Sequence, residues 1–225
     1  MSVAPAAELQ WPRRFAAWAL RTGTLPQALA CIALAMIFST AGAYRMATSI
    51  RVEDIVFGPT RSPAVDALLG FIGVERTAVL VYMLQRSFDA LVVASALTPI
   101  FLWLLGSSAM HAAARLRGAR GHPFVPLLVL FAYAELVYQA PTSLGGIIFG
   151  AEGAGAQLAS VLSLVMLVWF GFVIYRGIEL HYEVPGDRAR AIFVLGALVF
   201  YLVPLVLIVG ALVAIVMAAA ILQYF

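Results

Sequence analysis

Long apolar runs, separated by short polar stretches, make up most of this 225-residue chain. A helix that crosses the hydrocarbon core of a bilayer, about 30 Å thick, needs roughly 20 predominantly apolar residues. Five runs qualify: about Pro26 to Ala47, Arg86 to Ala112, Pro123 to Ile148, Gln157 to Arg176 and Ala189 to Leu222. The pattern predicts an all-α, polytopic membrane helix bundle with five transmembrane helices.

An amphipathic segment precedes the first run. In WPRRFAAWALR, residues 11–21, apolar side chains recur at helical spacing on one face, and the arginines lie elsewhere around the helix. We predict an interfacial helix on the inner leaflet of the membrane. Its expected anchoring residues are Trp11, Arg13, Arg14, Phe15 and Trp18. We therefore divide the chain into a cytoplasmic amphipathic segment, residues 1–25, and a five-span membrane domain, residues 26–225.

A second such segment, residues 62–84, is apolar but interrupted by Asp66, Glu75 and Arg76. We interpret it as a surface or re-entrant helix that leads into the second span, within an outside loop of about residues 48–85. A sixth span is the competing interpretation.

Prolines and glycines interrupt the apolar runs. Pro99, Pro141 and Pro204 can each break a helical ladder. The last run is longer than a bilayer needs, so we expect it to tilt, to bend at Pro204 or to protrude. Small residues permit close helix contact, which we expect at Gly23, Gly42, Gly106, Gly171, Gly177, Gly196 and Gly210.

Composition excludes a soluble domain, because 64% of the residues are hydrophobic and only 11% are charged. The single cysteine, Cys31, excludes an intramolecular disulfide and a cysteine metal cluster. All basic residues other than histidine are arginine, and alanine is abundant, which indicates a G+C-rich and so a prokaryotic source.

Arginine placement predicts the orientation, since short cytoplasmic loops collect positive charge. The arginine-rich stretches are the N-terminal segment, the loop after span two and the loop after span four. The only charged residue in the turn between spans three and four is Glu152. We predict a multi-pass protein of the cytoplasmic (inner) membrane, with its N-terminus inside and its C-terminus outside.

The most polar short stretch is RGIELHYEVPGDRARA, residues 176–191, in which Glu179, His181 and Glu183 alternate like metal or acid/base ligands. On a helix, however, the two glutamates share a face and the histidine points nearly the opposite way. A divalent-metal site could still form if His111 and His122 met one of these residues. We favour solvated loop charges, and we expect no catalytic residue, no metal and no cofactor.

The same stretch contributes to a predicted cytoplasmic docking surface for protein partners. Its residues are Arg115, Arg117, Arg120, Arg176, Glu179, His181, Glu183, Asp187 and Arg188. Between spans four and five, residues 185–187 are typical of a turn and a helix start, and Asp187 is able to cap the first amides of the last span.

A third set of polar residues lies within the apolar runs. We expect an intramembrane polar network of Arg45, Arg86, Asp89, Glu135, Gln139 and Tyr133. Ionisable groups at such depths are costly unless paired, and they are functional candidates by default. The network is either structural, holding the helix register, or a site for a proton, an ion or a lipid headgroup.

Several short motifs in the second half of the chain occur in a characteristic order. They are Ala132-Tyr133-Ala134 with a later proline, Trp169, Gly177-Ile178, and then Tyr182, Val184, Asp187 and Arg188 before an apolar last span. This order resembles the Yip family, the Rab/Ypt-GTPase-interacting membrane proteins, and in particular its divergent prokaryotic members. The proline comes later than is usual in the family, at Pro141, and the acidic segment that precedes span one in eukaryotic members is missing.

The resemblance implies a non-enzymatic membrane protein that acts in membrane organisation, trafficking or protein partnership. Because the acidic segment is missing, the resemblance leaves GTPase binding open. We expect membrane lipids and one or more proteins as partners, a possible homo-oligomer and no nucleic acid. The alternative is a transporter or a lipid-translocating, scramblase-like protein that uses Arg45, Asp89 and Glu135 as a polar path across the membrane.

Overall fold

The structure is a computed structural model that describes residues 10–49, 52–58, 62–150 and 153–224. Within its helices, the side chains of residues 68, 89, 208, 211, 212, 214–216 and 218–224 are not described. Four predictions therefore fall partly outside the described residues. These concern the first nine residues of the N-terminal segment, residues 50–51 and 59–61 of the outside loop, Glu152 in the turn between spans three and four and, in the intramembrane set, the side chain of Asp89.

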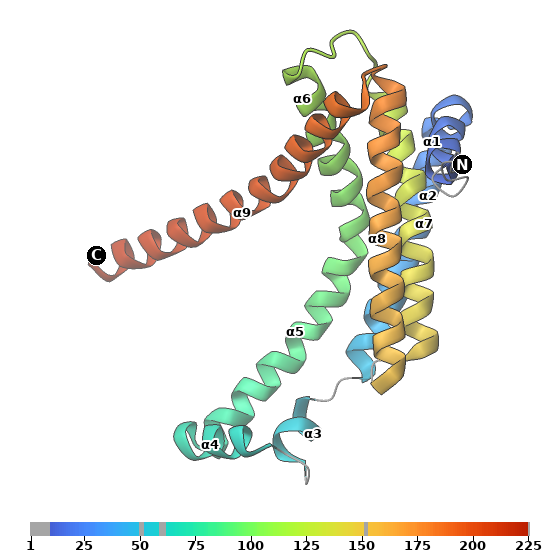
Figure 1. The fold of residues 1–225 in the computed structure, drawn as a ribbon. Helices are drawn as coiled ribbons and strands as arrows, with labels where there is room; N and C mark the ends of the chain where they lie inside the picture. The colour runs from blue at the N-terminus through green and yellow to red at the C-terminus, as the bar shows by residue number, and fades with distance from the viewer. Residues whose placement is uncertain (1–9, 50–51, 59–61, 151–152, 225) are drawn as a thin grey trace, which may run out of the picture. The chain divides into compact units, whose positions relative to one another are not determined.

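The described parts of the chain are helical and contain no strand (Figure 1). The elements are α1 (Gln10–Thr22), α2 (Leu25–Ser49), α3 (Val52–Phe57), α4 (Pro63–Ile72), α5 (Val74–Phe101), the π-helical turn η2 (Leu102–Gly106), α6 (Ser107–Leu116), α7 (Val125–Phe149), α8 (Gly153–His181) and α9 (Gly186–Tyr224). Five helical stretches of the described chain are long and apolar enough to cross a membrane. The predicted all-α, five-span class is confirmed.

The second span differs from its prediction in extent. It runs without interruption through α5, η2 and α6, from Val74 to Leu116. The predicted segment of residues 62–84 is not one helix, because Gly73 adopts a φ of 87° and separates α4 from α5. With 10 residues, α4 is about 15 Å long and cannot cross the bilayer alone, so the sixth-span alternative is wrong.

None of the three prolines ends its helix. Pro99, Pro141 and Pro204 lie inside α5, α7 and α9. Only Pro99 is followed closely by an irregularity, the π-helical turn that begins at Leu102. Proline removes one backbone donor, and a π-turn shifts the ladder by one residue, which can accommodate that loss.

The chain divides into two compact units. The first contains residues 1–29, 101–134 and 170–225, and the second contains residues 30–100 and 135–169. The helices α2, α7 and α8 each contribute one end to each unit.

In the first unit, the beginning of α7 is the most buried segment, and Leu127 and Leu130 have no exposed surface. The absence of a side chain at Gly177 lets the end of α8 pack directly on Leu130. The indole of Trp103 donates a hydrogen bond to the Leu128 carbonyl at 2.7 Å, which joins η2 to α7. Close contact of Gly196 with Met110 brings α9 against α6, as Figure 1 shows.

In the second unit, small residues set the helix contacts. A Cβ at Gly42 would lie 3.3 Å from the Cβ of Ser143, so α2 and α7 pack closely there. A Cβ at Gly145 would lie 2.7 Å from Leu162, where α7 meets α8. The Ser39 hydroxyl of α2 donates to the Ser95 carbonyl of α5 at 2.7 Å.

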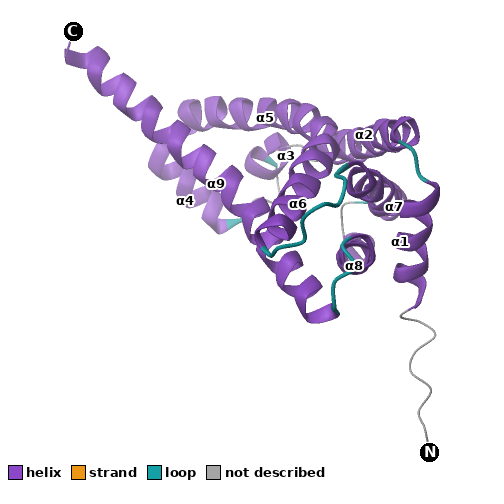
Figure 2. Ribbon diagram, turned by 90° about the horizontal axis from the view of Figure 1, so that it is seen from above, coloured by secondary structure: helices purple, strands orange, loops and turns teal. Residues whose placement is uncertain are grey.

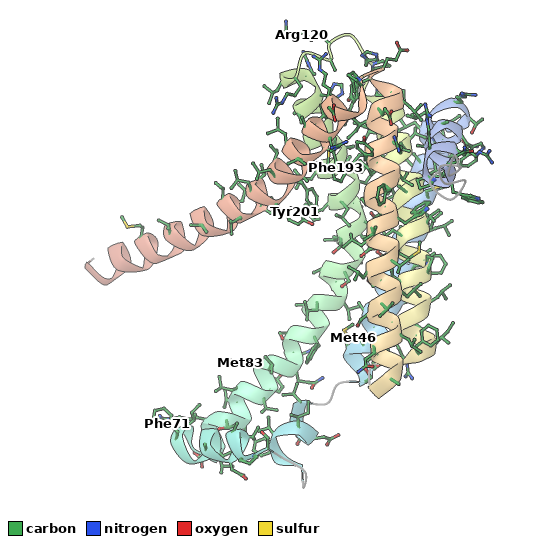
Figure 3. The ribbon with its side chains drawn as sticks, viewed as in Figure 1. Met46, Phe71, Met83, Arg120, Phe193 and Tyr201 are labelled. Atoms are coloured by element: carbon green, nitrogen blue, oxygen red, sulfur yellow. The ribbon has the colours of Figure 1, made fainter. Side chains whose placement is uncertain are left out.

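The predicted close contacts at glycines are mostly found. Those at Gly23, Gly42, Gly106, Gly177 and Gly196 are tight. Gly171 makes only ordinary van der Waals contact, and nothing lies within 4 Å of a Cβ at Gly210, so close packing at Gly210 was a wrong prediction. The outer helix surfaces are apolar, as membrane helices require. Phe71, Met83 and Tyr201 in Figure 3 are 91%, 61% and 71% exposed.

Candidate functional site

One end of the first unit carries both predicted inner loops, residues 117–124 and 182–185, which are drawn in teal in Figure 2. Side chains fasten them together. The Arg188 guanidinium donates to the Arg117 carbonyl. The His181 Nε2 donates to the Pro123 carbonyl at 2.9 Å. We call the surface formed by these two loops, the ends of α6 and α8 and the beginning of α9 the rim.

A cluster of aromatic and imidazole rings lies beneath the rim. The Tyr182 hydroxyl lies 2.7 Å from His111 Nδ1, and it joins the α8–α9 turn to α6. The ring centroids of His122 and His181 are 5.7 Å apart, and that of His122 is 5.4 Å from Tyr182. Burial raises the pKa of the Tyr182 phenol, which keeps its proton. The phenol is therefore the donor and the His111 nitrogen the acceptor.

Most of the predicted docking residues lie on the rim with exposed side chains. Arg115, Arg117, Arg120, Glu183, Asp187 and Arg188 are exposed, and Figure 3 shows Arg120 in the loop before α7. Arg176 and Glu179 are less exposed, because they form an ion pair with each other at 2.7 Å.

The alternating acids and histidine do not form one site. His181 is the last residue of α8, and Glu183 follows it in a left-handed conformation with a φ of 51°. Glu183 therefore does not share a helix face with Glu179, contrary to the helical interpretation of the sequence. His111, His122 and His181 do gather here, but no group of described residues has the arrangement of a metal site.

The turn before α9 is predicted correctly in position. α9 begins at Gly186, and the Ala189 amide donates to the Pro185 carbonyl at 2.9 Å. Asp187 lies inside the first helical turn rather than at the cap, and its carboxylate is 3.4 Å from the Arg190 guanidinium.

A surface cavity of about 330 Å³ lies beside the rim, between α1, residues 122–126 and the end of α8. Three of its lining side chains carry nitrogen: Arg21, His122 and His181. The others are apolar and include Leu20, Pro126 and Leu180. The buried Nδ1 atom of His122 has no hydrogen-bond partner among the described residues.

The predicted anchor helix α1 packs on α7. Its buried side consists of small residues, because Ala16 and Ala19 have no exposed surface. The Trp18 ring meets the Tyr133 ring edge-on, with 5.1 Å between the ring centroids. Trp11 is 69% exposed. Together with Arg14, Phe15 and Trp18, it lines a shallow pocket on the surface of α1.

Two of the predicted intramembrane residues, Arg45 and Glu135, lie in different surroundings. Arg45, on α2, is exposed, whereas Glu135, on α7, is 1% exposed with one carboxyl oxygen unpartnered among the described residues. Arg86 is exposed on α5. The Gln139 amide donates to the Ser143 hydroxyl, and the Tyr133 hydroxyl donates to Gln27, both at 3.2 Å.

Depth separates Arg45 from Glu135. The helices α2 and α7 run in the same direction, since Gln27 pairs with Tyr133 near their beginnings and Gly42 packs on Ser143 further along. Arg45 lies beyond the Gly42–Ser143 contact and Glu135 lies well before it. About 16 Å of helix separates their levels.

A second cavity, of about 320 Å³, lies between α2, α5 and α7 in the second unit. Gln139 lines it, together with four hydroxyl residues that our sequence analysis did not single out: Ser39, Ser95, Thr142 and Ser143. The sequence contains a helical repeat that identifies the residues of this cavity. Ser39, Gly42 and Ala43 on α2, and Gln139, Thr142 and Ser143 on α7, repeat at i, i+3 and i+4.

These features define a multi-pass membrane protein, with five apolar helices and a fastened, arginine-bearing rim at one end of its first unit. The family model of the Yip1 domain matches residues 9–209, and the chain belongs to this family. The match includes the first half of the chain as well as the second half, where the sequence motifs lie. The searches of curated proteins and of solved structures gave no match.

Proposed function

We propose that this Yip-family protein is a non-enzymatic adaptor or membrane-organising subunit of the inner membrane, and that its protein partners dock on the rim. The observation that carries the proposal is the fastening of the rim, in which Arg188 binds the Arg117 carbonyl and His181 binds the Pro123 carbonyl. A docking surface benefits from such preorganisation, because less conformational entropy is lost on binding.

The charge of the rim favours an acidic partner. Arg115, Arg117, Arg120 and Arg188 are exposed, and of these four side chains only that of Arg188 makes a hydrogen bond to the described part of the chain. Arginine is the side chain best suited to bidentate recognition of carboxylates across an interface. We place the rim on the cytoplasmic side, where positive charge collects in short loops.

The bonding of the polar residues supports a role without catalysis. Glu179 pairs with Arg176, His181 binds a carbonyl and His111 accepts from Tyr182. For Glu179 and His111 these contacts are structural, because the ion pair and the hydrogen bond occupy lone pairs that a general base or a metal ligand would use.

Site-specific photocrosslinking in intact membranes tests the docking proposal. A photoreactive amino acid at position 120 should give a discrete crosslinked protein band, and one at position 154, which is exposed at the opposite end of α8, should not. Replacing Arg115 and Arg117 by glutamine should reduce the band at position 120 by tenfold or more, since each charge-assisted contact contributes roughly 1.5–3 kcal/mol and about 1.4 kcal/mol corresponds to a factor of ten. Equal bands at both positions, or an unchanged band in the glutamine variant, would contradict docking at the rim.

Lipid translocation is the second candidate, and the cavity between α2, α5 and α7 favours it. Polar groups from Ser39, Gln139 and Ser143 line that cavity within the spans. Glu135 would be the ionisable residue of the path, with Arg45 and Asp89 as its other predicted members. Fluorescent lipid in proteoliposomes reports exchange between leaflets. The translocation proposal requires exchange that is faster than in empty vesicles and that falls in Glu135→Gln, and wild-type exchange at the empty-vesicle rate would exclude it.

A further inference from the structure

The cavity beside the rim has the chemistry of an anion site. We propose that it binds the phosphate of an anionic phospholipid headgroup, with Arg21 and His122 as the recognising side chains and His181 in the wall beside them. The proposal does not depend on protein docking, because Arg21 and His122 are outside the residues assigned to the docking surface.

The charge balance of the cavity is positive. Arg21 lies in the last turn of α1 and is exposed. No carboxylate of the described residues lies within ion-pair distance of its guanidinium, and none lines the cavity. Guanidinium groups match phosphate oxygens with two parallel hydrogen bonds, so Arg21 is the expected primary contact.

His122 supplies a further donor. The Nε2 proton of His181 is already donated to the Pro123 carbonyl, so His181 forms part of the cavity wall and does not contact the phosphate. The Nδ1 atom of His122 is buried without a partner in the described part of the chain. A buried polar atom without a hydrogen bond is destabilising. A phosphate oxygen would satisfy His122 whenever Nδ1 carries a proton, so occupancy of the cavity removes that deficit.

The walls of the cavity favour a lipid over a free anion. Leu20, Pro126 and Leu180 give it an apolar side. The cavity also lies where α7 begins and α8 ends, which is the boundary between span and loop. Its volume of about 330 Å³ is at the small end of the range of about 300–1,000 Å³ for ligand pockets. This space accommodates a headgroup and leaves the acyl chains outside, along the apolar helices.

The position of α1 gives the headgroup a fixed wall. Trp18 packs on Tyr133, and the Gly23 backbone approaches Val129 closely, so both ends of the last two turns of α1 are held on α7. At the beginning of the same helix, the exposed ring of Trp11 is typical of a side chain at the headgroup level of a bilayer.

The test measures binding of phosphatidylglycerol to the purified full-length protein by native mass spectrometry, with phosphatidylcholine as the neutral reference. We expect one phosphatidylglycerol to be retained preferentially. Arg21→Gln should weaken this binding about tenfold, the effect of losing one charge-assisted contact. His122→Phe keeps the ring that packs on His181 and removes the nitrogen, and it should also weaken binding.

Arg190→Gln is the matched control, because Arg190 is an exposed arginine near the beginning of α9 that belongs neither to the cavity nor to the predicted anchor. It should leave the affinity within about twofold, whereas general attraction to anionic lipid would make both arginine variants equal and would overturn the proposal. Inorganic phosphate distinguishes the two sources of the anion. Displacement of the lipid only at far higher phosphate concentrations supports a lipid site, and displacement at equal concentrations would overturn it.

Discussion

The Tyr182 hydroxyl shows how much of the rim depends on single side chains. The phenol is 2% exposed and bonds His111, which lies on another helix and is 71 positions away in the chain. Glu183, the next residue, has a left-handed backbone conformation, which few residues other than glycine and asparagine adopt readily. Tyr182 therefore positions the turn that orients the exposed charges of residues 183–188.

Tyr182→Phe should destabilise the protein by about 1–2 kcal/mol, because the His111 nitrogen loses its hydrogen bond in a buried place. Thermal unfolding in detergent measures the effect. Tyr201→Phe is the control, since Tyr201 is 71% exposed and makes no hydrogen bond in the described structure, and it should not change stability. Equal melting temperatures for Tyr182→Phe and the wild type would show that this hydrogen bond does not hold the rim.

Glu135 is a second example at the scale of single residues. The sequence identifies it as a polar group in the third span, and the structure shows it to be fully buried. Its assignment to one network with Arg45 depended on similar depths, and depth along a span cannot be read from a run whose ends are known only to within a turn. The contact between Gly42 and Ser143 sets that register, and it depends on the shape of both helices.

At the scale of the elements, close packing of α7 and α8 depends on the absence of a side chain. The end of α8 crosses the most buried part of α7 at Gly177, and Leu130 fills the space that a side chain at Gly177 would need. Within a membrane, helices associate through such packing, because their apolar surfaces gain nothing by leaving lipid. The fourth span is therefore positioned mainly by shape at this contact.

Gly177→Ala should cost about 1–3 kcal/mol, the usual effect of overpacking a close contact. The cost should fall in the Leu130→Ala background, because the smaller side chain makes room for the added methyl group. Gly146→Ala provides the comparison, since nothing lies within 4 Å of a Cβ at Gly146. Unfolding in mixed detergent micelles gives each free energy, and a Gly177→Ala protein as stable as Gly146→Ala would contradict the packing assignment.

At the scale of the whole molecule, the orientation in the membrane is a prediction. Five helical stretches of the described chain are long and apolar enough to cross a membrane, and the placement of arginine predicts that the rim lies on the inner side. The orientation also decides which compartment holds the docking partner, so it is the prediction with the widest consequences.

Cysteine labelling tests the orientation in a background in which the single cysteine, Cys31, is replaced by serine. A cysteine at position 120 should react with a membrane-impermeant reagent only after the inner side is opened. A cysteine at position 154, exposed at the other end of α8, should react from outside in intact cells. Labelling of position 120 from outside would reverse the topology and remove the proposed docking surface from the cytoplasm.

The sequence by itself determined the class, the number and approximate positions of the spans, and the family. These features depend on composition and local order, because insertion of about 20 apolar residues into hydrocarbon needs no particular partner. Only the tertiary structure decided which residues meet. The residues that meet come from segments far apart in the chain, as in the pairs His111 with Tyr182 and Gly177 with Leu130. The same holds for the three nitrogen-bearing side chains of the cavity beside the rim. Their distances depend on helix register and side-chain shape, which no local pattern of apolar and polar residues contains.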